Sequence, residues 1–425
     1  MKDYKPRVAD TMLEDKLDAM GAVLIEGAKY CGKTTLACQH AKSVLYMADP
    51  DNKEQNLIMA QTNIGRLLKG DTPRLIDEWQ IAPQIWDAVR NEVDKRSEDG
   101  QFILTGSAVP ANPGAIFHSG TGRMSWLRLR TMSLWESGDS SGEVSLSKLF
   151  KDSESVDGSS CIDIDRLAFL TCRGGWPKAI LKENPKSALM QAEEYYEAVV
   201  RSDISRADGI LRDPELARRL MRSYARNQGS QATVSTFVAD LSANGVSPSE
   251  NTVYAYLNAL KSIFVIEDSM AWNPNLRSKT AVRTSDTRYY SDPSIATAAL
   301  GLGPDDLIGD LNTFGLMLET LCVRDLRVYA DAIGGTVYHY RDKTGLECDA
   351  VVHLKNGKYG LIEVKLGGER LISEGASNLV KLANKIDTDK INKPSFLMVL
   401  TGVGQYAYRR PSDGVLVVPV GSLRN

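Results

Sequence analysis

The chain has 425 residues, of which 43% are hydrophobic and 25% charged, and its formal net charge is −3. This length allows about three domains, and the hydrophobic share excludes wholesale disorder. The small negative charge excludes a general electrostatic attraction to nucleic acid or to an anionic membrane.

The six cysteines have no CxxC spacing, which argues against a zinc site and indicates reduced thiols. The amino terminus is too polar for a secretory signal, and no apolar run approaches the ~20 residues that span a bilayer. We therefore expect a soluble, cytoplasmic protein with no membrane partner.

A phosphate-binding loop is predicted at residues 27–34, which read Gly-Ala-Lys-Tyr-Cys-Gly-Lys-Thr and match G-x-x-x-x-G-K-[ST]. An apolar run of strand length precedes the motif at 22–26, and good helix formers follow it. Backbone N–H groups of such a loop converge on phosphate oxygens. We expect ATP here, with Lys33 on the β- and γ-phosphates and the Thr34 hydroxyl on Mg²⁺. The predicted nucleotide contacts are Gly27, Ala28, Lys29, Tyr30, Cys31, Gly32, Lys33, Thr34 and Thr35.

An acidic pair follows a second short apolar run, because residues 74–78 read Arg-Leu-Ile-Asp-Glu. In phosphate-loop enzymes an aspartate at a strand end supports Mg²⁺, and we assign this role to Asp77. Glu78 is then placed to act as the general base that activates the attacking water. A surface acidic pair after a buried strand is the alternative interpretation.

Two further residues complete the predicted catalytic set. Residues 101–107 indicate the next core strand, which ends in small polar residues at the edge where such sheets bind ligands. Thr105 would hydrogen-bond the attacking water or the γ-phosphate, and a turn cap is the alternative. Arg123 would bring positive charge to the transition state. The sequence leaves open whether Arg123 acts in its own subunit or in a neighbour within a homo-oligomer.

The organisation along the chain predicts four regions. They are a phosphate-loop ATPase domain at 1–136, a linker and helical region at 137–212, a winged-helix-like domain at 213–292 and an α/β domain at 293–425.

In the winged-helix-like region, helical patterns are expected at 214–227, 233–244 and 249–260, followed by a strand at 263–266. Ser249 is placed to cap the third helix. A helix, a turn and a helix of this size can enter a DNA major groove, which makes DNA an expected partner. The outward residues of the third helix would be Glu250, Asn251, Tyr254, Asn258 and Lys261. They carry little positive charge, so a protein-contact or spacer role is the alternative.

A hairpin is predicted where Asn356-Gly357 separates two strand-like runs at 345–354 and 359–365. A two-residue turn would place carboxylates on the apolar face, which is unfavourable. A three-residue loop separates apolar from charged side chains and would pair Asp349 with Lys365.

In that register Asp349, Glu363 and Lys365 share one face, as in the D…(D/E)-x-K constellation of restriction-endonuclease-like nucleases. The carboxylates would hold a divalent metal, and the lysine would steady the attacking water. Glu319, on a helical stretch at 314–324, could add another carboxylate. A decayed site or a structural salt bridge is the alternative interpretation.

The order of these motifs resembles AAA-superfamily ATPases of bacteria and archaea that carry a C-terminal domain of unknown function. The resemblance rests on residues 27–35, 75–80, 104–107, 122–123, 174–177, 289–292, 315–319, 340–342, 345–349 and 362–365. It implies an α/β fold with a parallel-sheet AAA-type ATPase domain, a winged-helix middle domain and a restriction-endonuclease-like C-terminal domain. The group usually has Arg-Gln where Lys29 and Tyr30 stand, and lysine lacks the bidentate geometry of arginine.

The chain is therefore expected to be a Mg²⁺-dependent ATPase whose nucleotide state biases the position of its C-terminal domains. Two alternatives remain open. One is a nucleic-acid-processing ATPase–nuclease with Asp349, Glu363 and Lys365 in catalytic roles. The other is a non-catalytic, nucleotide-dependent interaction protein.

Overall fold

The computed structural model describes residues 4–106, 120–243, 245–273, 285–389 and 391–425. The chain divides into two compact units. The first consists of Met1–Thr131, Arg201–Asp213 and Asn258–Val265, and the second of Met132–Val200, Pro214–Leu257 and Ile266–Asn425. Each unit is therefore assembled from pieces of chain that lie far apart in the sequence.

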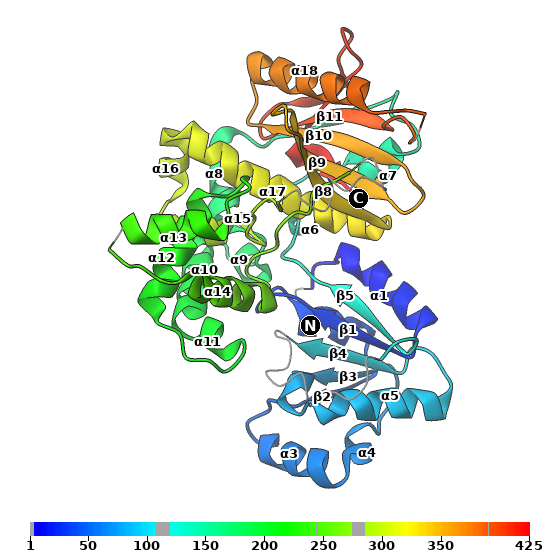
Figure 1. The fold of residues 1–425 in the computed structure, drawn as a ribbon. Helices are drawn as coiled ribbons and strands as arrows, with labels where there is room; N and C mark the ends of the chain where they lie inside the picture. The colour runs from blue at the N-terminus through cyan, green and yellow to red at the C-terminus, as the bar shows by residue number, and fades with distance from the viewer. Residues whose placement is uncertain (1–3, 107–119, 244, 274–284, 390) are drawn as a thin grey trace. The chain divides into compact units, whose positions relative to one another are not determined.

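A five-stranded parallel sheet forms the centre of the first unit, in the order β2-β3-β4-β1-β5 (Figure 1). Its strands are β1 (Ala22–Glu26), β2 (Ser43–Tyr46), β3 (Arg74–Asp77), β4 (Phe102–Gly106) and β5 (Met124–Arg128). The central strands are nearly continuous apolar runs because a parallel sheet is covered on both faces. The register sets Thr105 beside both Ile25 and Asp77, so the carboxyl ends of three strands meet at one edge. The expected parallel α/β core is confirmed.

Helices cover both faces of this sheet. They are α1 (Val8–Ala19), α2 (Lys33–His40), α3 (Lys53–Thr62), α4 (Ile64–Leu67) and α5 (Gln84–Arg96). Side chains of β4 alternate between the faces, as the period of two in a strand requires. Ile103 packs in one core with Leu13 of α1 and Leu36 of α2. Leu104 packs in the other core with Val89 of α5. The strand ends that lead into the phosphate loop are thus held from both sides.

The second unit begins with short elements and helices. They are α6 (Leu134–Ser137), β6 (Val144–Ser145), α7 (Leu146–Leu149), β7 (Gly158–Ser159), α8 (Ile164–Arg173), α9 (Pro177–Ile180) and α10 (Pro185–Ala198). A π-helical turn, Val199–Asp203, and α11 (Ile204–Arg206) continue α10 and lead the chain into the first unit.

The three helices expected in the middle region are present as α12 (Pro214–Arg226), α13 (Val234–Ala243) and α14 (Glu250–Ser262). The Ser249 hydroxyl accepts a hydrogen bond from the Thr252 N–H at 3.1 Å, which confirms the predicted cap. The strand expected to begin at 263–266 is reduced to isolated antiparallel bridges with residues 287–290. Phe264 has a φ of 63°, which interrupts an extended chain, and only isolated bridges such as Ile266 with Tyr290 form nearby among the described residues.

A seven-stranded sheet dominates the carboxyl-terminal half, in the order β7-β12-β13-β11-β10-β9-β8. Its longer strands are β8 (Gly335–Arg341), β9 (Glu347–Leu354), β10 (Tyr359–Lys365), β11 (Phe396–Thr401), β12 (Tyr406–Arg409) and β13 (Leu416–Pro419), and β14 (Leu423–Arg424) pairs with β6. The helices are α15 (Pro293–Leu300), α16 (Pro304–Gly309), α17 (Leu311–Ala332) and α18 (Glu369–Lys385). Leu379 of α18 packs in one core with Leu361 and Val399 of the sheet.

The predicted register of the β9–β10 hairpin is wrong by two residues. The structure pairs Leu361 with Val351 and Ile362 with Ala350, so one further step sets Asp349 opposite Glu363 instead of Lys365. The loop has three residues as expected but begins one residue earlier, at 355–357, where Gly357 adopts a φ of 82° and the Leu354 N–H bonds the carbonyl of residue 358. A shift of two residues leaves every side chain on its face. The predicted grouping of the charged residues is therefore retained.

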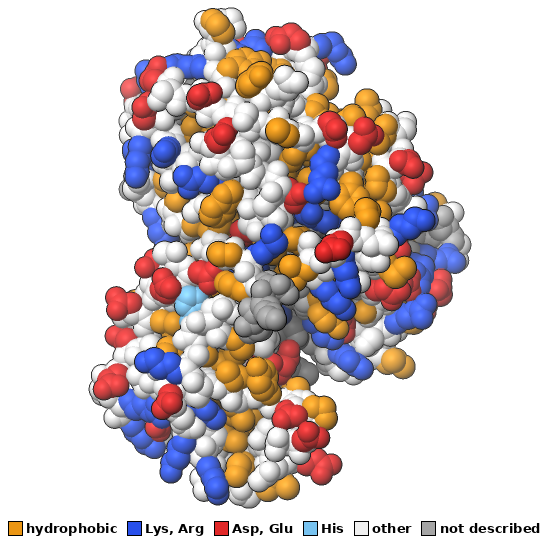
Figure 2. All heavy atoms as spheres, turned by 180° about the vertical axis from the view of Figure 1, so that it is seen from behind, with side chains coloured by type: hydrophobic (Ala, Val, Ile, Leu, Met, Phe, Trp, Pro, Cys, Tyr) orange, Lys and Arg blue, Asp and Glu red, His pale blue; other side chains and the backbone are white. Residues whose placement is uncertain are grey.

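The surface shows no single-sign charge field on the face seen in Figure 2, where basic and acidic side chains of the described residues are interspersed. This agrees with the small net charge of −3. Among the helices of the described residues, none combines the length and the apolar character needed to cross a membrane.

Candidate functional site

The phosphate loop joins β1 to α2. Gly32 occupies the N-cap of α2 with a φ of 104°, and the helix begins at Lys33. A Cβ atom at Gly27 would lie 2.1 Å from the Leu129 carbonyl oxygen, so only glycine allows this close approach. The loop backbone is thus pressed against the sheet edge while the amino end of α2 opens toward it.

The Lys33 side chain lies inside the loop and is only 6% exposed. Its ammonium group donates hydrogen bonds to the carbonyl oxygens of Gly27 and Ala28, each at 2.8 Å. A buried ammonium needs such partners. The loop carbonyls therefore hold the Lys33 ammonium inside the loop that the sequence predicts to bind phosphate.

Asp77 is the point where three elements converge. Its Oδ1 accepts a hydrogen bond from the Thr34 hydroxyl of α2 at 2.7 Å and from the Thr105 hydroxyl of β4 at 2.6 Å. The sheet register explains the second bond because Thr105 lies directly beside Asp77. A hydroxyl and a carboxylate are oxygen ligands of the kind that Mg²⁺ takes together with substrate phosphates. Thr34 and Asp77 therefore fit the predicted magnesium role.

Glu78 follows Asp77 in a left-handed conformation, with a φ of 57°. Such a backbone costs about 1–3 kcal/mol in a residue other than glycine and concentrates at functional sites. The Gln80 side-chain amide donates to Glu78 Oε2 at 2.5 Å and holds the carboxylate in place. Gln80 was missed as a site residue, although it ends the 75–80 motif on which the family resemblance rests.

The remaining loop side chains point in different directions. Tyr30 is exposed, whereas Cys31 is buried and its thiol donates to the Leu129 carbonyl at 3.4 Å. Thr35 is exposed on α2. Lys29 reaches Asp203, with Nζ 2.6 Å from Oδ1. No motif in the sequence indicated Asp203, which lies 174 residues from Lys29.

Arg123 lies at the opposite end of the sheet from the phosphate loop. Its carbonyl accepts a hydrogen bond from the N–H of Ala22, the first residue of β1, and its guanidinium pairs with Asp94 at 2.7 Å. The loop follows Glu26, the last residue of β1, about 13 Å further along the strand. Arg123 therefore does not reach the phosphate loop of its own subunit.

The second unit brings together the other predicted set. Lys365 Nζ lies 2.7 Å from Glu363 Oε2 and 3.8 Å from Asp349 Oδ2. The Val364 N–H donates to Asp349 Oδ2 at 2.7 Å. Glu319 of α17 accepts a hydrogen bond from the Tyr289 hydroxyl. We call Glu319, Asp349, Glu363 and Lys365 the acidic cluster.

Burial governs the protonation of the acidic cluster. It raises the pKa of Glu319 well above the usual range, and the nearby Asp349 charge adds to this. Burial also raises the pKa of Asp349, and it raises the pKa of Glu363 to about 8. Burial alone would lower the pKa of Lys365, but the Asp349 and Glu363 charges raise it. One ammonium therefore faces three carboxyl groups whose affinity for protons is increased.

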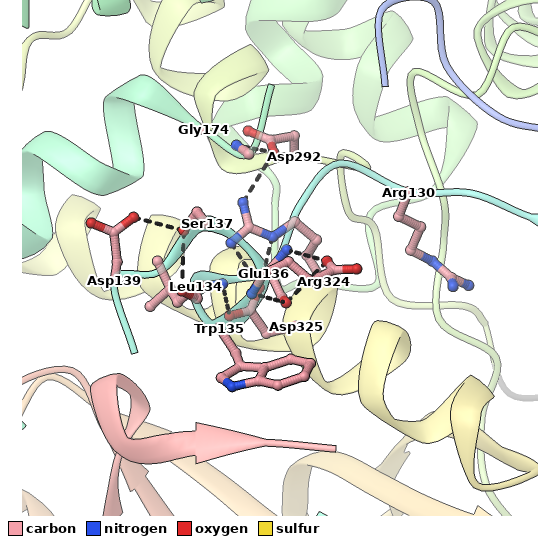
Figure 3. A network of polar contacts seen from close by, with 12 residues as sticks. Arg130, Leu134, Trp135, Glu136, Ser137, Asp139, Gly174, Asp292, Arg324 and Asp325 are labelled. Atoms are coloured by element: carbon pink, nitrogen blue, oxygen red, sulfur yellow. Dashed lines mark hydrogen bonds and ion pairs between the residues drawn. The ribbon is translucent and has the colours of Figure 1, made fainter. Parts of the chain in front are cut away.

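Other segments singled out in the sequence have a structural role (Figure 3). Arg324 of α17 is buried and pairs with Asp292 at 3.0 Å and with Asp325 at 2.7 Å. Asp292 Oδ2 also accepts from the Gly175 N–H, and Asp325 Oδ2 from the Leu134 N–H, each at 3.0 Å. This network ties residues 174–177 and 289–292 to α17 and α6. Buried charges persist when they are paired and hydrogen-bonded in this way.

A cavity of about 670 Å³ lies elsewhere in the second unit, among α8, α10, α12 and α15. Arg218 and Glu197 on its wall pair at 2.5 Å. Cys172 also lines it, and burial raises the pKa of this thiol to about 12, which makes it a poor nucleophile. None of the described residues predicted for nucleotide or metal binding lines this cavity.

Three family models match separate parts of the chain. An AAA domain matches residues 20–137, a domain of unknown function (DUF8612) matches 164–306, and another (DUF4143) matches 314–423. The AAA match, together with the loop and parallel sheet, shows a phosphate-loop ATPase domain of the AAA type. The other two models describe no activity, so the winged-helix and restriction-endonuclease-like expectations stay predictions.

Two curated proteins are similar to most of the chain. They are the uncharacterized proteins Mb2031c of Mycobacterium bovis and Rv2008c of Mycobacterium tuberculosis, each 24% identical over 362 residues, which is 84% of this chain and 73% of theirs.

Two solved structures show weaker likeness. The Walker-type ATPase PABY2304 of Pyrococcus abyssi is 13% identical, with a TM-score of 0.45 over 70% of this chain and 96% of its own. A point variant of RuvB from Thermotoga maritima is 14% identical, with a TM-score of 0.25 over 62% and 86%. Both scores are too low to establish a shared fold.

Proposed function

We propose that this chain is a Mg²⁺-dependent ATP hydrolase. The observation that carries the proposal is the convergence of the Thr34 and Thr105 hydroxyls on one oxygen of Asp77, at 2.7 and 2.6 Å. This places a loop threonine, a strand-end aspartate and a neighbouring strand's threonine around one point. The arrangement is the one that Mg²⁺ and a γ-phosphate require in phosphate-loop enzymes.

Each residue then has a defined task. Lys33 exchanges its two carbonyl partners for β- and γ-phosphate oxygens, and Thr34 and Asp77 would hold Mg²⁺. Glu78, oriented by Gln80, takes a proton from the water whose oxygen attacks the γ-phosphorus. The bond from that phosphorus to the β–γ bridging oxygen breaks, and ADP and phosphate leave. Thr105 orients the water or the γ-phosphate.

Phosphate release tests the assignment of Glu78 directly. We expect Glu78→Gln to retain ATP binding and to lose about 10²–10⁴-fold in turnover, as loss of a general base does. Lys33→Ala should lose nucleotide binding itself. Glu54→Gln is a matched control, because Glu54 is an exposed glutamate on α3. Equal rates in the wild type and Glu78→Gln, with and without DNA, would remove Glu78 as the water activator.

The acidic cluster supports a second candidate function, an ATPase–nuclease that acts on DNA. Lys365 contacts both Glu363 and Asp349, and Glu363 Oε1 is a buried atom to which the described part of the chain gives no hydrogen-bond partner. Among the described residues, no three His, Cys, Asp or Glu side chains are arranged to hold a metal. Metal binding would therefore need side-chain movement in the cluster.

Nicking of DNA with Mg²⁺ or Mn²⁺ tests this candidate. We expect salt-sensitive DNA binding and nicking that is lost in Lys365→Ala and kept in Lys381→Ala, an exposed lysine of α18. Nicking that survives Lys365→Ala would refute the assignment. ATP binding without turnover, even with DNA present, would instead favour a nucleotide-dependent interaction protein.

A further inference from the structure

Lys29, the third residue of the phosphate loop, is held by a residue far away in the sequence. Its Nζ lies 2.6 Å from Asp203 Oδ1. The Asp203 side chain is only 10% exposed, and the Lys29 side chain 39%. Both residues belong to the first unit. An ion pair in which the carboxylate is nearly buried depends on its partner more than a surface pair does.

The backbone at Asp203 is unusual as well. A π-helical turn, Val199–Asp203, lies between α10 and α11 and ends at this residue. Such turns are rare and occur frequently at functional sites. The piece Arg201–Asp213 belongs to the phosphate-loop unit, although the chain before and after it belongs to the other unit. The π-turn therefore delivers one carboxylate to the loop from the segment through which the chain enters this unit.

A carboxylate beside a phosphate loop is unfavourable for nucleotide binding, because like charges repel in a partly buried site. Lys29 cancels that charge in the observed state. Its ammonium is part of the loop, so a bound triphosphate would compete with Asp203 for the same cation. Lys33 lies inside the loop and is already assigned to the phosphates. Lys29 is therefore the loop cation that can bind either Asp203 or a phosphate.

We propose that Lys29 exchanges Asp203 for the triphosphate when ATP binds, and that Asp203 is a positioning residue that sets nucleotide affinity through Lys29. This inference rests on the proposed ATP hydrolase function. Release of Asp203 therefore couples the nucleotide state to the segment through which the chain enters the unit. In this proposal the Lys29–Asp203 ion pair alone regulates the affinity for nucleotide.

Equilibrium binding of Mg-ATP and Mg-ADP to the full chain tests the exchange, with wild type, Asp203→Asn, Lys29→Gln and the double variant. Removing the competing carboxylate should tighten ATP binding about three- to fivefold in Asp203→Asn. In the Lys29→Gln background no cation is released and only the repulsion is removed, so the same change should tighten ATP binding by a clearly smaller factor than in the wild type. Asp203→Glu should restore the wild-type affinity.

Asp208→Asn is the matched control, because Asp208 pairs with Arg212 at 2.7 Å within the same segment and contacts a different cation. We expect it to leave the ATP affinity unchanged. A purely structural brace would instead make Asp203→Asn bind ATP more weakly and unfold at lower temperature. That result, or an equal effect of Asp203→Asn in both backgrounds, would overturn the exchange.

The failure of the exchange can be told apart from the failure of the proposed function. No ATP binding by the wild type would overturn both. Binding that is lost in Lys33→Ala, together with independent effects of Lys29 and Asp203, would overturn the exchange alone.

Discussion

The phosphate-loop site and the acidic cluster both place carboxyl groups beside a lysine, but they hold the charge in different ways. Asp77 is partly exposed and receives two hydroxyl hydrogen bonds, while Lys33 is satisfied by carbonyl oxygens. In the acidic cluster one buried and two partly buried carboxyl groups lie near one ammonium, and burial raises the pKa of Glu363 to about 8. At the phosphate-loop site, the hydrogen bonds to Lys33 and Asp77 can be replaced by those of a ligand. In the acidic cluster, the raised pKa values of the carboxyl groups favour their neutral, protonated forms.

The largest expected effect in this comparison is at Asp77. Asp77→Asn keeps the shape of the side chain but removes the charge that supports Mg²⁺, so turnover should fall about 10³-fold. Thr34→Ser, which keeps the hydroxyl, is the control and should remain active. Steady-state phosphate release over a Mg²⁺ titration measures both. Full activity of Asp77→Asn at ordinary Mg²⁺ concentrations would contradict the assignment.

Removing Lys365, the cation of the acidic cluster, should lower the stability of the protein and leave ATP turnover unchanged. Lys365→Met leaves Asp349 and Glu363 without their ammonium, and loss of this hydrogen-bonded partner at a partly exposed lysine should cost about 1–3 kcal/mol of unfolding free energy. Urea unfolding followed by circular dichroism gives this value. Lys381→Met, at an exposed position of α18, is the comparison and should change little. Equal stability of the two variants would show that the cluster does not need Lys365.

The pH dependence of stability should also distinguish the two regions. Because the folded pKa of Glu363 is raised from 4.5 to about 8, its contribution is complete below the unfolded pKa and is lost as pH rises toward 8. Glu363→Gln should therefore flatten the fall in stability between about pH 5 and 8. Urea unfolding across this range tests the effect. Glu374→Gln, which alters an exposed glutamate, should keep the wild-type slope.

The smallest expected effect is at Thr105. Thr105→Val removes one of the two hydrogen bonds to Asp77 and should lower turnover about tenfold, a loss equivalent to about 1.4 kcal/mol. Thr105→Ser should restore most of the activity because it returns the hydroxyl. A turnover in Thr105→Val equal to that of the wild type would limit Thr105 to a structural role.

Local motifs made the phosphate-loop site predictable. The loop, Asp77 and Thr105 could be assigned because the loop follows an apolar strand and the other two lie at the carboxyl ends of apolar strands, which a parallel sheet brings to one edge. The position of Arg123 could not be judged in this way. It precedes β5, so it lies at the other end of the sheet, and only the strand bounds reveal this.

Contacts between distant segments were not predictable. Asp203 reaches Lys29 through a π-turn, and no periodic pattern announces such a turn. In the hairpin, alternation of apolar and charged residues determined which face each side chain occupies, but not the partner across the strand. A shift of two residues satisfies the same alternation, so loop geometry at Gly357 decided the pairing.

The division of the first unit into three pieces of chain has a consequence for how this protein is made. Its parallel sheet is complete once Thr131 has left the ribosome, but the pieces Arg201–Asp213 and Asn258–Val265 are synthesised later. At about 5–20 residues per second, the last piece follows many seconds after the sheet. The phosphate loop is therefore translated well before Asp203. The first unit can complete its folding only after the residues of the second unit that lie between its three pieces have been synthesised.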